Sequence, residues 1–104
     1  MEILLFYIPC GSSEEATRMG RMAVEQKLAA CANVFPIQSI FSWEGAIQSE
    51  GEFVTVLKTL PSHKEELAKY IAAHHAYKIP CIAQWKVEVN ASYGLWMMEQ
   101  MDIK

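Results

Sequence analysis

The chain has 104 residues, a formal net charge of −3 and a hydrophobic content of 52%, which suit a single domain over residues 1–104. Because its lysines and arginines are scattered, the concentrated basic face that nucleic-acid binding needs is excluded. No stretch approaches the roughly 18 apolar residues of a membrane span and the first residues lack a signal-peptide pattern, so we expect a cytoplasmic protein without a membrane partner.

The first part of the chain predicts a strand, a helix and a second strand. Residues 2–8 are almost continuously apolar, which is typical of a central, covered strand. Ser12 and Glu15 form a capping box, and apolar residues at helical spacing continue to about residue 30. The aromatic side chains within residues 31–43 share one parity, which predicts a long strand.

A long hairpin is predicted in the middle of the chain. Glu44 and Gly45, and again residues 49–52, supply turn residues, and residues 53–60 are the expected returning strand. The two strands are long for a domain of this size, so the hairpin should project past the sheet and offer an edge to a neighbouring chain. The high hydrophobic content also favours burial of apolar surface against another copy.

The remaining residues predict a second helix, a fourth strand and a short final helix. Ser62 repeats the capping pattern before a helix that ends ahead of Pro80. Residues 81–89 alternate as a strand does, and Tyr93 begins the apolar face of the C-terminal helix. The order β-α-β-β-α-β-α predicts an α+β, ferredoxin-like fold, in which two helices cover one face of an antiparallel sheet.

Four short motifs lie at the ends of these elements: KLAACAN at residues 27–33, SIFSWEG at 39–45, LKT at 57–59 and HHAYKIP at 74–80. In this order and spacing they resemble the divalent-cation-tolerance (CutA) family over almost the whole chain. The resemblance implies a homotrimer whose sheets pair edge to edge around a three-fold axis. It also implies a role in tolerance of, and response to, divalent metals, copper especially.

The resemblance leaves two alternatives to a metal-binding function. The architecture is similar to that of the trimeric PII signalling proteins, which bind small effectors in clefts between subunits, so an effector or a protein partner could occupy such a cleft here. The second alternative is a scaffold trimer whose association with metals is indirect. The chain departs from the family at Ala76, Lys78 and Cys81, where carboxylates or proline are usual. Losing carboxylates and gaining a cysteine favours a softer metal such as copper or zinc.

His74, His75 and Cys31 are the candidate metal ligands, because imidazole and thiolate bind copper and zinc. Each has a structural alternative: His74 packs on the apolar stripe of its helix, His75 hydrogen-bonds a neighbouring loop, and Cys31 is a small buried hydrophobe. Cys10 follows the first strand in a turn and is expected to be the most exposed thiol. Cys81 shares the apolar parity of its strand and is expected to be buried.

Tyr77, Glu44, Lys58 and Trp43 are the candidate residues of a cleft or a subunit contact. The same-parity neighbours of Lys58 are apolar, and an unpaired buried charge is unfavourable, so we expect an ion pair across subunits with Glu44, or else a bound anion. Alternatively, Glu44 is only a turn residue, and Tyr77 only fills the space between the helix and the strand. The clustered aromatic residues fit the core and subunit interface better than a ligand cage.

The sequence favours binding over catalysis. It contains no Gly-rich phosphate loop, no HExxH and no GxSxG motif. An acylphosphatase would need an arginine directly after the first strand, and the first arginine here is Arg18. We therefore do not expect an enzyme.

Overall fold

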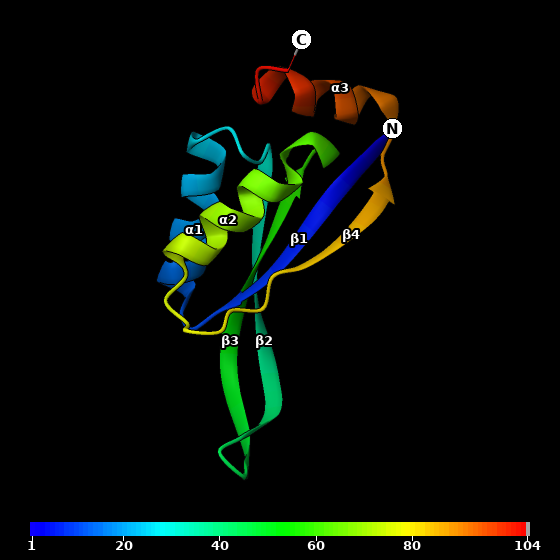
Figure 1. Cartoon of the computed structure of the whole chain (residues 1–104). Coiled ribbons are helices and arrows are strands. Elements are labelled where there is room, and N and C mark those ends of the chain that lie inside the picture. The colour runs from blue at the N-terminus through cyan, green and yellow to red at the C-terminus, as the bar shows by residue number, and fades with distance from the viewer. Residues whose placement is uncertain (104) are drawn as a thin grey trace.

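A four-stranded antiparallel sheet with strand order β2-β3-β1-β4 forms the frame of the protein in the computed structural model, which describes residues 1–103. The elements in chain order are β1 (Glu2–Cys10), α1 (Ser13–Glu25), β2 (Cys31–Trp43), β3 (Ala46–Thr59), the 3₁₀ turn η1 (Pro61–His63), α2 (Lys64–His74), β4 (Ala83–Glu88) and α3 (Ala91–Gln100). Helices α1 and α2 lie together over one face of the sheet, and α3 crosses the end at which the chain begins (Figure 1). The predicted α+β, ferredoxin-like fold is confirmed.

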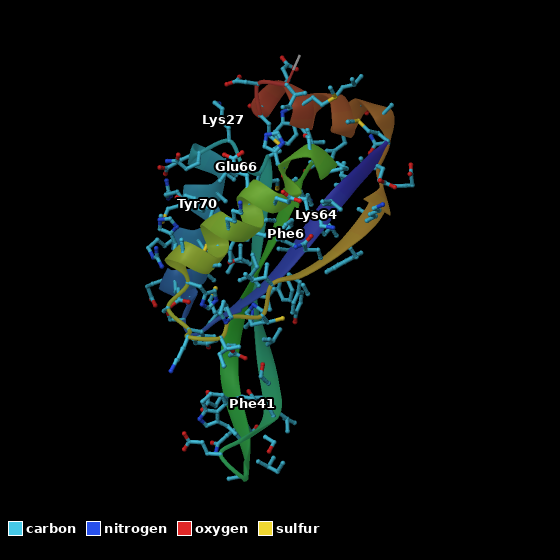
Figure 2. The ribbon with its side chains drawn as sticks, viewed as in Figure 1. Phe6, Lys27, Phe41, Lys64, Glu66 and Tyr70 are labelled. Carbon is cyan, nitrogen blue, oxygen red and sulfur yellow. The ribbon has the colours of Figure 1, made fainter. Side chains whose placement is uncertain are left out.

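The side chains of β1 divide the core into two layers, because successive residues of a strand face opposite sides of the sheet. Phe6, with Leu4, Ile8 and Cys10 of the same strand, packs in one cluster with Met19 of α1 and Ile71 of α2. Figure 2 shows Phe6 beneath α2. Ile3 faces the other way and is buried with Met97 of α3. The central strand is thus covered on both faces at its first residues, as predicted.

Strands β2 and β3 form a hairpin that extends well past the other two strands (Figure 1). Glu44 and Gly45 make its two-residue turn, with φ angles of 50° and 80°. Positive φ at both positions is the type I′ geometry that matches the twist of paired strands. The second turn expected at residues 49–52 is wrong. These residues pair with β2 throughout, and the continuous ladder outweighs their weak strand preference.

Helix α1 begins as predicted but ends earlier. The Ser12 hydroxyl accepts the N–H of Glu15 at 3.1 Å, which confirms the cap. The helix ends at Glu25 rather than near residue 30, because Lys27 adopts a left-handed φ of 59°. A left-handed residue of this kind closes a helix and turns the chain, here into β2.

Helix α2 begins without the cap expected at Ser62. The Ser62 hydroxyl lies 2.9 Å from Nδ1 of His63 instead, and the helix has no side-chain cap. Pro61 starts the 3₁₀ turn that leads into α2. Proline suits this position because its φ is already close to helical values and its missing N–H would have no partner.

Helix α1 packs closely on β2 and β3 because Gly20 presents no side chain to them. A Cβ atom at Gly20 would lie 2.8 Å from Cβ of Ala32 and 3.4 Å from Cγ2 of Thr55. The buried Thr55 hydroxyl also donates to the Ala16 carbonyl at 2.6 Å. The close approach at Gly20 and the hydrogen bond at Ala16 together fix the distance between α1 and the sheet.

Gly20→Ala should lower the free energy of unfolding by about 1–3 kcal/mol, because the added methyl overlaps Ala32. The higher helix propensity of alanine offsets at most about 1 kcal/mol of this loss of stability. Urea unfolding at one protein concentration measures the difference. Gly51→Ala is the matched control, since a Cβ there meets no atom within 4 Å. Equal midpoints for wild type and Gly20→Ala would contradict the packing described.

Candidate metal site and adjoining groove

A thiol, a carboxylate and an imidazole meet at the end of β1. Cys10 is the last residue of β1, Glu15 lies in the first turn of α1, and His75 directly follows α2. One ligand atom from each lies within 4.8 Å of the other two. Cys10 and the His75 side chain are fully buried, and Glu15 is 15% exposed. We call these three residues the buried cluster.

His75 is held at both ring nitrogens. Nε2 lies 2.9 Å from the Pro9 carbonyl oxygen, which can only accept, so Nε2 carries the proton. Nδ1 then has a free lone pair and accepts the backbone N–H of Tyr77 at 3.0 Å. The ring is therefore neutral and fully hydrogen-bonded. His75 is thus hydrogen-bonded, as its structural alternative expected, but to strand β1 and to its own loop rather than to a neighbouring loop.

Burial raises the pKa of the Cys10 thiol to about 11, and the nearby Glu15 carboxylate adds to the increase. Sγ of Cys10 lies 3.8 Å from Nε2 of His75. Oε1 of Glu15 is buried without a hydrogen-bond partner among residues 1–103, and lies 3.7 Å from Nδ1 of His75. A buried carboxylate oxygen without a partner is unfavourable. A cation bound beside it would relieve this penalty, so the donor set fits a metal ion.

Two expectations about cysteine exposure are wrong. Cys10 is fully buried, because β1 continues through residue 10, which pairs with Phe53 and points toward the helices. Cys81 is exposed, because β4 begins only at Ala83. Cys10 and Glu15 were thus missed as site residues. The available signal was that Cys10 has the same parity as Leu4, Phe6 and Ile8, with which it would be buried if the strand ran to residue 10.

The other two sequence-predicted ligands lie outside the buried cluster. His74 is exposed, stacks on Tyr70 with ring centroids 4.2 Å apart, and donates from Nδ1 to the Tyr70 carbonyl at 2.8 Å. Cys31 pairs with Lys58 on the sheet face opposite to Cys10. The structure therefore brings His75 into the cluster, but neither His74 nor Cys31.

Lys58 has an aromatic neighbour. Its Nζ lies 5.3 Å from the ring centroid of Tyr93 on α3, a cation–π geometry. Within the part of the chain that the structure describes, no carboxylate forms an ion pair with it. Glu44 lies at the hairpin tip, whereas Lys58 pairs with Cys31 at the opposite end of the hairpin. A Lys58–Glu44 pair could therefore form only between chains, and it stays a prediction.

A groove of about 780 Å³ adjoins the buried cluster, between the projecting hairpin and residues 77–81. Its walls include Phe41, which Figure 2 shows on the hairpin, and also Trp43 and Tyr77. The Tyr77 hydroxyl donates to Oε2 of Glu52 on β3 at 2.6 Å. Burial and this bond raise the pKa of Tyr77 above its usual range, so the hydroxyl keeps its proton. Of the four cleft candidates, the structure brings Trp43 and Tyr77 together.

Comparison with known proteins finds similarity over nearly the full chain. The family model described as CutA1 divalent ion tolerance protein matches residues 4–100. The divalent-cation tolerance protein CutA of Archaeoglobus fulgidus is 43% identical over 97 residues, which are 92% of this chain and 95% of that protein. The crystal structure of divalent ion tolerance protein CutA1 from Ehrlichia chaffeensis has a TM-score of 0.92 at 31% identity, over 95% of this chain and 94% of that one. The structure of the periplasmic divalent cation tolerance protein CutA from A. fulgidus has a TM-score of 0.89 at 37% identity, over 97% of this chain and 99% of that one.

Cys10 should resist alkylation by iodoacetamide at pH 8 in the native protein. The thiolate is the reactive form, and a thiol with a pKa of about 11 is only ~0.1% ionised at that pH. Peptide mass spectrometry of timed samples measures the rate, with the urea-unfolded chain as control. We expect native labelling at least ~100-fold slower than in the unfolded chain, since burial adds to the effect. Similar rates in both states would contradict the buried position of Cys10.

Proposed function

This chain belongs to the CutA1 divalent ion tolerance family, and we propose that it binds a metal ion at the buried cluster of Cys10, Glu15 and His75. The unpartnered buried oxygen of Glu15, 3.7 Å from an imidazole nitrogen, carries the proposal. Carboxylate, imidazole and thiolate are all ligands of zinc, and the last two also suit copper. A metal ion bound there would supply the positive charge that the carboxylate lacks.

The chemistry of the donors favours a soft or borderline ion. Cys10 binds metal as a thiolate, so it must release its proton, and its pKa of about 11 opposes that release at neutral pH. Only an ion with high affinity for sulfur would offset this, which favours copper or zinc over magnesium or calcium. Because binding releases a proton, the affinity should rise with pH.

We also propose that the chain forms a homotrimer. Ile47 on the hairpin is 75% exposed and does not line the groove. Ile40 and Trp43, which are 73% and 55% exposed, do line it, so a partner copy that covers them would make the groove a cleft between subunits. β2 and β4 are the edge strands of the sheet, and edge strands carry backbone groups that can pair with another chain. Exposed apolar side chains beside open sheet edges are typical of surfaces that another protein covers. A second copy of this chain is the partner that its family resemblance indicates.

The groove supports a second candidate function, the binding of a small effector as in PII-like signalling. Its volume of about 780 Å³ lies within the range of small-molecule sites. Glu50 and Glu52 line it together with Trp43. Carboxylates beside an aromatic ring suit a ligand that combines an apolar part with a cationic group. Both candidate functions are binding functions, and we propose no enzymatic activity.

We propose a cytoplasmic location on the basis of cysteine usage. The three cysteines are free, which suits a reducing compartment. Among residues 1–103, no helix combines the length and apolar character that crossing a membrane requires. One similar protein is described as periplasmic, so cell fractionation is the direct test.

Calorimetric titration with Zn²⁺ tests the proposed ligands. Cys10→Ser should weaken binding at least ~tenfold, because it removes the thiolate. Cys31→Ser is the matched control and should bind like the wild type, since Cys31 lies on the opposite face of the sheet. His74→Ala should also be unchanged. Loss of binding in these two variants but not in Cys10→Ser would support the sequence-predicted ligands instead, and no binding by wild type would overturn the metal function.

Light scattering tests the trimer. The mass of one chain is 11.8 kDa, so we expect a mass of about 35 kDa. Ile47→Glu places a charge on an apolar residue that is 75% exposed and should shift the mass toward the single chain. Val24→Glu on α1 is the control and should not. A wild-type mass of one chain would end the proposal.

A further inference from the structure

We propose that a metal ion in the buried cluster releases Tyr77 from the wall of the groove, so that residues 75–77 act as a metal-sensitive clasp. This inference rests on the proposed metal site and adds a consequence to it. The contacts of His75 and Tyr77 join this internal site to the surface of the protein.

Tyr77 touches both the buried cluster and the groove. Its backbone N–H donates to Nδ1 of His75 at 3.0 Å, and its ring lies 4.8 Å from the His75 ring. Its hydroxyl donates to Glu52 at 2.6 Å on the groove side. A Cβ atom added at Gly11 would lie 3.4 Å from this hydroxyl, so the tyrosine lies against backbone that has no side chain. One residue thus connects the two sites.

A neutral imidazole that binds a metal cannot keep the bond to the Tyr77 amide. If the ion binds at Nδ1, it takes the lone pair that accepts the Tyr77 N–H. If it binds at Nε2, the ring proton moves to Nδ1, and Nδ1 can then no longer accept. The Pro9 bond of Nε2 is lost in the second case as well. Either mode of binding therefore frees the Tyr77 amide.

Few other contacts within residues 1–103 hold the segment that carries Tyr77. Residues 75–82 form no helix or strand, and residues 76–79 are exposed. His75 itself is already extended, with φ of −78° and ψ of 139°. The contacts of His75 and the hydroxyl bond to Glu52 therefore position this segment. Loss of the amide bond weakens the anchor of Tyr77 at its backbone end.

The clasp changes what the groove offers to a ligand. While Tyr77 is bound, Oε2 of Glu52 is occupied by the tyrosine hydroxyl. When Tyr77 leaves, the carboxylate of Glu52 becomes available beside Glu50 in the groove wall. A ligand with a cationic group would then bind better to the metal-loaded protein. Because such coupling is reciprocal, anything that opens the clasp must also favour metal binding.

Amide hydrogen exchange of the full chain, followed by NMR with and without Zn²⁺, tests the first step. We expect the Tyr77 amide to exchange about tenfold faster with Zn²⁺, the change that loss of one hydrogen bond produces. Amides of the β1–β3 ladder should not change. In Cys10→Ser the same change should require an at least ~tenfold higher Zn²⁺ concentration. Zn²⁺ binding that depends on Cys10 but leaves the Tyr77 amide unchanged would overturn the clasp and leave the metal site standing.

The affinity of Tyr77→Phe for Zn²⁺ tests the coupling. This variant lacks only the hydroxyl bond to Glu52, so it should bind Zn²⁺ about three- to tenfold more tightly than wild type. Tyr70→Phe is the matched control, because the Tyr70 ring stacks on His74 outside the cluster, and its affinity should equal that of wild type. Equal affinities for both variants, or weaker binding by Tyr77→Phe, would overturn the clasp. Absence of Zn²⁺ binding in every protein would overturn the metal site and the clasp together.

Discussion

The hydrogen bond from Nε2 of His75 to the Pro9 carbonyl joins the end of α2 to the end of β1. It sets the tautomer of the ring, which leaves Nδ1 to accept the amide of Tyr77. It also holds the imidazole beside the thiol of Cys10. Both the buried cluster and one wall of the groove therefore depend on the orientation of a single ring. A metal ion that competes for this ring acts on both sites.

The alternation of side chains along the strands decides which residues can share a site. Cys10 faces α1 and α2 with the even-numbered residues of β1, while Cys31 lies beside Lys58 and Tyr93 on the other face. Two thiols on opposite faces of one sheet cannot bind the same ion within a chain. Apolar side chains on the hairpin, such as Ile47, stay exposed among residues 1–103, which leaves them for a partner.

The buried cluster and the groove support different functions, and their separation is physically reasonable. A site with almost no access to water selects an ion by donor chemistry, here sulfur, nitrogen and one carboxylate oxygen. An open groove lined by carboxylates and aromatic rings instead selects a ligand by shape and charge. Tyr77 connects them because its backbone amide binds His75 in the buried cluster while its hydroxyl binds Glu52 in the wall of the groove.

The sequence by itself determined the order of the elements, the cap at Ser12 and the family, because periodicity, capping and motif order are local features of a chain. It placed His75 among the candidate ligands, but chose His74 and Cys31 beside it. Only the tertiary structure decided that Cys10 and Glu15 meet His75. Periodicity carries no information about which loop ends meet in space, and a strand that ends two residues later than expected turns a predicted surface thiol into a buried one.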